Sequence, residues 1–95
     1  MRINKEGRTK TELLESLDGL KEKFKNEISE YSIDLSKITD GYKIKAEKKI
    51  LFINFWVDAD ITAGEEYYDI TWDTNAPEGK VNLAIDKVKS FLEKV

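Results

Sequence analysis

The sequence predicts an α+β fold of two layers. A four-stranded antiparallel meander carries an N-terminal and a C-terminal helix on one of its faces, in the order α-β-β-β-β-α. Apolar residues recur at helical spacing near both ends of the chain, and they alternate with polar residues in between. A helix with one apolar stripe has to bury it, and an antiparallel sheet with one apolar face provides the surface. Residues 1–95 are expected to form a single domain with one core.

The first helix is predicted to begin near Thr9, because Thr9 and Glu12 have the spacing of a capping box. Its apolar stripe would be formed by Leu13, Leu17, Leu20, Phe24 and Ile28. Gly19 lies off this stripe and weakens the helix by about 1 kcal/mol relative to alanine. Residues 1–8 are expected to be an arm that precedes the helix.

Four strands are predicted between the helices. Ile33 and Leu35 mark the first strand, and an Asp40–Gly41 turn leads to the second strand, in which Tyr42, Ile44 and Ala46 alternate with charged residues. We expect a tight turn at Lys48–Lys49, a long strand over residues 50–58, and a loop over residues 59–65. The fourth strand would place Tyr68, Ile70 and Trp72 on one face.

Successive residues of a strand point to opposite faces, so the long strand has two different sides. Leu51, Ile53, Phe55 and Val57 form an entirely apolar side, which both helices should cover, with Phe55 fully buried. The predicted pairing places Val57 opposite Tyr68, and Phe55 opposite Ile70. The other side would then expose Phe52, Trp56 and Tyr67.

The last helix is predicted to open at residues 75–78. Asn75 is a favourable N-cap, Pro77 suits a first helical turn, and Glu78 interacts favourably with the helix dipole. The apolar stripe of this helix would be formed by Val81, Ile85, Val88, Leu92 and Val95.

Composition excludes several classes of function. The chain has no histidine and no cysteine, and no catalytic, cofactor or metal motif is recognisable. Net charge is −3, which argues against a nucleic-acid binder. Asp58 to Asp69 has no EF-hand spacing, since the glycine stands at position 7 rather than 6. We therefore expect a non-enzymatic protein without cofactor or metal. With no apolar run long enough for a signal peptide or a membrane span, we expect a cytoplasmic location and no membrane contact.

Two neighbouring features indicate a binding surface. Residues 50–73 contain six acidic residues and no basic one, and the exposed aromatic side lies within the same segment. Aromatic side chains with a charged rim are typical of protein interfaces. The predicted partner-binding residues are Phe52, Trp56, Tyr67, Asp58, Asp60, Glu65, Glu66 and Asp69.

The occupant of this surface is open to several interpretations. The leading one is a protein partner, as for an inhibitor, an immunity protein or an adaptor, and a second copy of the chain would also fit. The acidic groups would also suit a nucleic-acid mimic that binds a basic protein. A further alternative is a small-ligand pocket between sheet and helices, lined by Tyr42, Tyr68 and Trp72. The aromatics could instead stabilise only the sheet, or be covered by the arm of residues 1–8.

Overall fold

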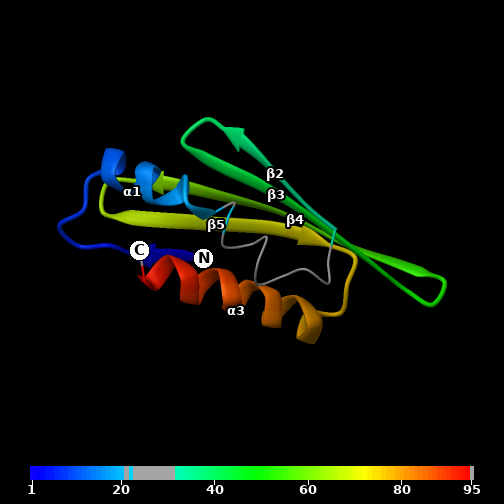
Figure 1. The fold of residues 1–95 in the computed structure, drawn as a ribbon. Coiled ribbons are helices and arrows are strands. Elements are labelled where there is room, and N and C mark those ends of the chain that lie inside the picture. The colour runs from blue at the N-terminus through cyan, green and yellow to red at the C-terminus, as the bar shows by residue number, and fades with distance from the viewer. Residues whose placement is uncertain (21, 23–31, 95) are drawn as a thin grey trace.

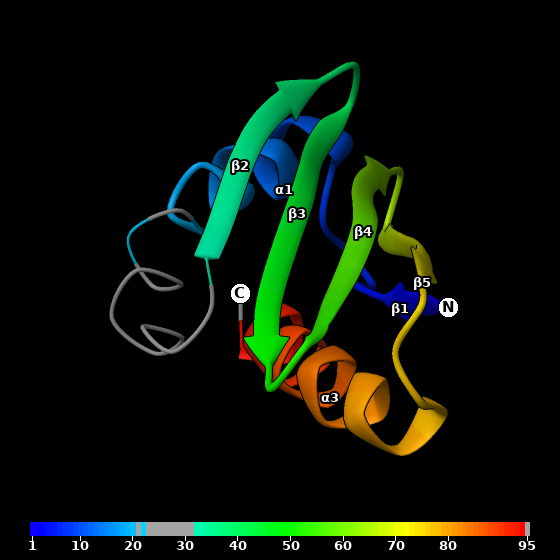
Figure 2. The same cartoon turned by 90° about the vertical axis from the view of Figure 1, so that its right-hand side faces the viewer.

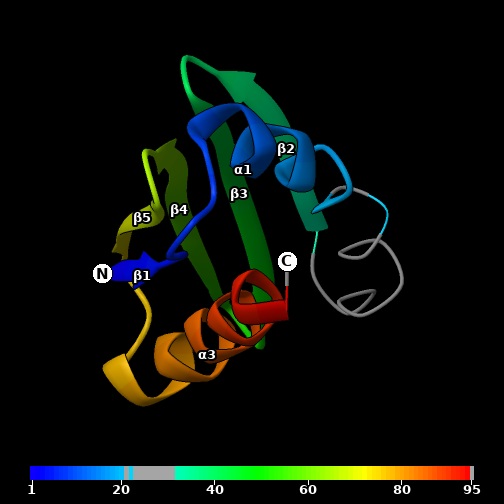
Figure 3. The ribbon, with the colours of Figure 1, turned by 90° about the vertical axis from the view of Figure 1, so that its left-hand side faces the viewer.

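A computed structural model of the chain describes residues 1–20, 22 and 32–94. Its elements are β1 (Arg2–Asn4), α1 (Lys10–Leu17), β2 (Ser32–Ile38), β3 (Gly41–Ile50), β4 (Ile53–Gly64), β5 (Tyr67–Thr74) and α3 (Glu78–Lys94). The strands form one antiparallel sheet in the order β1-β5-β4-β3-β2, with α1 and α3 on the same side of it (Figures 1–3). The predicted α+β fold is confirmed, although the sheet has five strands rather than four.

The additional strand is formed by the N-terminal arm. Arg2, Ile3 and Asn4 pair with Asp69, Tyr68 and Tyr67 of β5. The backbone of Met1 exchanges two hydrogen bonds of 2.7 Å with Ile70. Ile3 is buried in the core. The arm is therefore part of the sheet, because one apolar side chain and a set of backbone hydrogen bonds hold it against β5.

Helix α1 begins as predicted and ends earlier. The Thr9 side chain accepts a hydrogen bond from Glu12 N (3.2 Å), which satisfies one of the free amide groups of the first turn. The helix ends at Leu17, with Asp18 as C-cap, one residue before Gly19. Leu13, Leu17 and Leu20 are fully buried. The predicted continuation of the stripe to Phe24 and Ile28 lies outside the described residues.

The two turns that bound β3 differ from the predicted ones. The β2–β3 turn is formed by Thr39 and Asp40, where Asp40 has positive φ, and Gly41 already belongs to β3. The β3–β4 turn is formed by Leu51 and Phe52, three residues later than Lys48–Lys49. The later turn lets Ile50 pair with Ile53 and makes the hairpin longer.

Strand β4 extends through the segment predicted as a loop. Ala59, Ile61 and Ala63 are buried, and they alternate with Asp58, Asp60 and Thr62. Ile61 rather than Phe55 therefore pairs with Ile70, and Thr74 rather than Tyr68 pairs with Val57. The register differs from the predicted one by six residues. An even shift keeps every side chain on its predicted face, because the side-chain period of a strand is two.

The core lies between the sheet and the two helices. It joins Ile3, Leu13, Leu17, Leu20, Ile44, Ala59, Ile61, Ala63, Tyr68, Ile70, Val88, Phe91 and Leu92. Phe55 and Val57 lie on the predicted side, but they are only half-buried, and Leu51 and Ile53 are exposed. The centre of the core is thus further along β4 than expected.

Helix α3 begins at Glu78, and its residues Val81, Ile85, Val88 and Leu92 are buried as predicted, while Val95 lies outside the described part. Asn75 has a different role from the predicted N-cap. Its Oδ1 accepts a hydrogen bond from Trp56 N (2.8 Å), and its Nδ2 donates one to the Asn54 carbonyl (2.9 Å). Asn75 therefore continues the pairing of β4 past the end of β5. Neither α1 nor α3 is long and apolar enough to cross a bilayer.

Candidate binding surface

The side of the sheet that faces away from α1 and α3 carries most of the predicted site residues. Figure 2 shows this outer face, over which no helix of the described chain lies. Asp58 and Asp60 point outward because they alternate with the buried Ala59 and Ile61. Asp69 and Asp73 of β5 point to the same side, since they alternate with the buried Tyr68 and Ile70 and with Trp72. These four carboxylates, Asp58, Asp60, Asp69 and Asp73, are called the acidic face below.

Strand pairing fixes what stands beside each carboxylate. Asp58 lies directly opposite Asp73 on one side and Lys45 on the other. Asp60 lies opposite Thr71 and Lys43, and the Lys43 ammonium is 3.6 Å from its carboxylate. Positive charge on this face therefore comes from Lys43 and Lys45 of β3 and from Arg2 of β1, which lies opposite Asp69. Between them, Asp58 of β4 and Asp73 of β5 stand next to one another. Among the described residues no group of three acidic side chains is arranged to hold a metal ion.

Tyr67 is engaged within the chain itself. It pairs with Gly64 across the β4–β5 ladder, and its ring occupies the space that a Cβ on Gly64 would need. The Arg2 guanidinium stacks on the ring, 3.9 Å from its centroid. An aromatic ring over a cross-strand glycine covers the backbone that the glycine leaves open. The predicted arm thus covers Tyr67, which acts here as a packing residue of the sheet.

The three predicted aromatic residues do not form one surface. Trp56 lies near the other end of β4, eight residues from Gly64, which corresponds to roughly 26 Å along the strand. Trp56 is half-buried, with its backbone N–H bound by Asn75. Phe52 lies in the β3–β4 turn and is 97% exposed. Only Trp56 therefore adjoins the acidic face as an accessible aromatic side chain.

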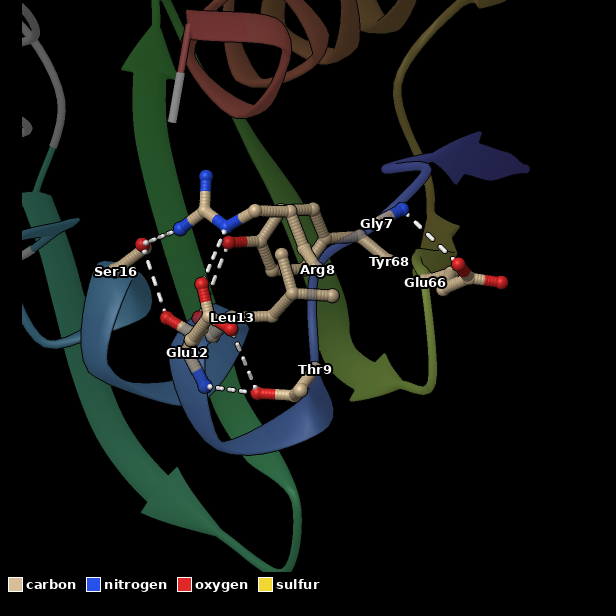
Figure 4. Close-up of polar contacts among 8 residues, drawn as sticks. All are labelled: Gly7, Arg8, Thr9, Glu12, Leu13, Ser16, Glu66 and Tyr68. Carbon is tan, nitrogen blue, oxygen red and sulfur yellow. Dashed lines mark hydrogen bonds and ion pairs between the residues drawn. The ribbon is translucent and has the colours of Figure 1, made fainter.

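Glu65 and Glu66 form the β4–β5 turn, and their roles differ. Glu65 is exposed. Glu66 has φ of 66°, and its carboxylate accepts a hydrogen bond from Gly7 N at 3.0 Å (Figure 4). Its backbone also bonds to Lys5 and Arg8. Glu66 therefore anchors the segment that joins β1 to α1.

Two of the three residues expected to line a ligand pocket have hydrogen-bond partners within the protein. The buried Tyr68 hydroxyl donates to the Leu13 carbonyl (3.1 Å), and the Tyr42 hydroxyl donates to Asp18 Oδ1 (2.6 Å). Trp72 is 39% exposed. Within the described residues every buried side-chain nitrogen or oxygen has a hydrogen-bond partner. The two hydroxyls thus stabilise the contact between α1 and the sheet, which disfavours a polar ligand in this gap.

Stability at high pH should depend on Tyr68. Burial raises the pKa of Tyr68 above its ordinary value of about 10. The folded state then holds its proton where the unfolded chain loses it, so this contribution is complete below about pH 10 and is lost as pH rises further. Tyr68→Phe should cost about 1 kcal/mol at neutral pH but reduce the decline above pH 10. Urea unfolding across this pH range measures both effects. If the free energy of unfolding fell equally steeply with pH in the wild type and in Tyr68→Phe, Tyr68 would not be the group responsible.

Compared with known proteins, the chain matches no family model, no curated protein and no solved structure.

Proposed function

We propose that this chain is a non-enzymatic cytoplasmic protein that acts by binding a protein partner, and that the acidic face is the contact surface. The partner would present lysine or arginine side chains to Asp58, Asp60, Asp69 and Asp73. Trp56, at one end of this face, would supply an aromatic contact, a residue type enriched where binding energy is concentrated.

The observation that carries the proposal is the pair formed by Asp58 and Asp73. The two carboxylates stand directly opposite one another on adjacent antiparallel strands. Like charges in this position destabilise a sheet, and an asparagine in either place would remove the repulsion. Local features that cost stability are expected where function requires them. A basic group from a partner would convert this repulsion into an attraction.

The rest of the outer face supports the same conclusion. A sheet face without a covering helix is open to a partner, and complementary charge increases the rate and the specificity of association. The basic residues on β3, Lys43 and Lys45, lie beside Asp60 and Asp58. With Arg2 of β1 beside Asp69, they place basic groups on both sides of the acidic face, which gives a partner one preferred orientation.

The test compares two double variants that remove the same charge. Asp58→Asn with Asp73→Asn changes the acidic face, and Glu15→Gln with Asp86→Asn changes exposed positions on the two helices. Affinity capture from native lysate should recover a partner with the wild type and with the helix variant, but not with the acidic-face variant. The acidic-face variant should also be more stable, by up to about 1 kcal/mol in urea unfolding. Retention of the same partner by both variants would refute the proposal.

The same experiment distinguishes between classes of partner. If added DNA releases the captured protein, the acidic face occupies a nucleic-acid site on that protein, as a phosphate mimic would. If sedimentation equilibrium shows that the wild type forms a dimer and the acidic-face variant a monomer, the partner is a second copy of the chain. Either result would identify the occupant of the acidic face without changing the surface proposed.

A further inference from the structure

The β3–β4 hairpin extends beyond the rest of the sheet. Within the described residues, the pairing with β2 ends at Glu47 and the pairing with β5 ends at Val57, beyond which Asn75 bonds the backbone of Trp56 and Asn54. The hairpin continues past both positions to the Leu51–Phe52 turn and forms one end of the elongated molecule, which measures 46 × 23 × 22 Å (Figure 1). Ile50, Leu51, Phe52 and Ile53 are called the hairpin tip below.

The hairpin tip is apolar and open to solvent. Leu51 is 85% exposed, Phe52 97% and Ile53 57%. Leu51 also has φ of 58°, a left-handed conformation in which a two-residue hairpin turn favours glycine. Neither folding nor solubility benefits from a strained leucine beside an exposed phenylalanine. The backbone strain at Leu51 and the exposure of Phe52 are both explained if the tip enters an apolar medium in the functional state.

Charge along the hairpin changes with distance from the tip. Lys48 and Lys49 precede the tip, and no acidic residue occurs between Lys48 and Val57. The acidic residues Glu47 and Asp58 are about 13 and 20 Å from the turn along the strands, further than the Debye length of about 8 Å at physiological ionic strength. A negatively charged surface that receives the tip would therefore meet the two lysines first.

The shape of the tip favours a lipid surface over a protein groove. Three exposed side chains on a convex end offer less area than the roughly 800 Å² that each partner of a standard protein complex buries. A bilayer accepts a convex apolar group without a matching cavity, and lysines beside inserted apolar residues gain from anionic headgroups.

We propose that the hairpin tip inserts into the headgroup region of an anionic lipid membrane, with Lys48 and Lys49 at the level of the phosphates. This contact departs from the sequence-based expectation of no membrane contact. It is reversible and peripheral, since only two turn residues and their neighbours enter the lipid. It is separate from the acidic face, whose nearest carboxylate, Asp58, lies five residues after Ile53 on β4. A protein bound to the acidic face would then be held at the membrane surface.

The test is co-sedimentation with vesicles of phosphatidylcholine alone and of phosphatidylcholine mixed with phosphatidylserine. The wild type should bind the mixed vesicles, more weakly as salt is raised. Leu51→Ser with Phe52→Ser should reduce binding about tenfold or more. Lys48→Gln with Lys49→Gln should remove the preference for phosphatidylserine. Leu83→Ser is the matched control, because Leu83 is a 68% exposed leucine on α3, away from the tip.

A second measurement reports the depth of insertion. Phe52→Trp should keep vesicle binding, and its fluorescence should be quenched by brominated acyl chains more strongly than that of the wild type. No binding to mixed vesicles, or equal binding by the wild type and the Leu51→Ser, Phe52→Ser variant, would overturn the proposal. It would also be overturned if the wild type ignored vesicles while the tip variant lost a protein partner or changed from dimer to monomer. The substituted tip residues are exposed, so the variants should fold, and circular dichroism should confirm this.

Discussion

Ile61→Ala should lower the free energy of unfolding by about 2–5 kcal/mol, because a large side chain is removed from the centre of the core. Ile61 is completely buried, and it stands between Tyr42 on β3 and Ile70 on β5. Ile61 belongs to a core that joins residues of both helices and of the sheet, so its close-packed surroundings can fill the resulting cavity only in part. For a domain of this size the loss is a large share of the total stability. Urea unfolding measures it directly.

Ile53→Ala is the matched control, since it makes the same change on the same strand and the same face. Ile53 is 57% exposed at the hairpin tip, so the loss should stay below about 1 kcal/mol. Phe55→Ala, at a half-buried position, should fall between the two. If Ile53→Ala proved as costly as Ile61→Ala, the core would be centred near residues 50–58, where the sequence predicted it.

The faces of the sheet could be predicted from sequence, and the register could not. Tyr42, Ile44, Tyr68 and Ile70 all lie on the helix side as predicted. Side-chain alternation determines the face, and it is unaffected when a strand shifts by an even number of residues. The register depends on where the turns fall. Positive φ at Leu51 is rare for leucine, so the sequence gives no signal for a turn there.

The second half of β4 is not recognisable as a strand from the sequence, for a related reason. Asp58, Asp60 and Gly64 are residue types common in loops, and the alanines between them are weak strand formers. The period-two pattern of Ala59, Ile61 and Ala63 was the available signal. Small residues suit this part of the core, because the pairing sets Ala63 opposite Tyr68 and Ala59 opposite Trp72. This match of small side chains on β4 with large ones on β5 can be recognised only once the register is known.

The candidate site was predicted in part. Asp58, Asp60 and Asp69 share the outer face as expected, since each alternates with an inward-facing residue. Phe52, Trp56 and Tyr67 are separated, because the six-residue shift moves Tyr67 from the neighbourhood of Asp58 to Gly64. The strand that covers Tyr67 is three residues long with one buried side chain, too short for a periodic pattern. The same shift places Asp73 opposite Asp58, and this makes Asp73 part of the acidic face.

Gly41→Ala should destabilise the fold by about 1–3 kcal/mol, through overpacking rather than a cavity. A Cβ at this position would collide with the backbone carbonyl of Ile61 on the adjacent strand. Backbone atoms cannot rotate aside as a side chain can, so β3 and β4 would have to separate where Gly41 pairs with Thr62. The distortion would extend to Ile61, the fully buried residue of β4, and the urea midpoint should fall accordingly.

Gly79→Ala is the control for this substitution and should have the opposite sign. Gly79 lies in the first turn of α3, and a Cβ there would meet no atom within 4 Å. Alanine favours the helix and restricts the unfolded chain, which should stabilise the protein by about 0.4–1 kcal/mol. Because both variants add one methyl group to a glycine, opposite shifts of the urea midpoint would show that the close approach of two strands decides the effect at Gly41. A neutral or stabilising Gly41→Ala would mean that β3 and β4 lie further apart at this end of the ladder.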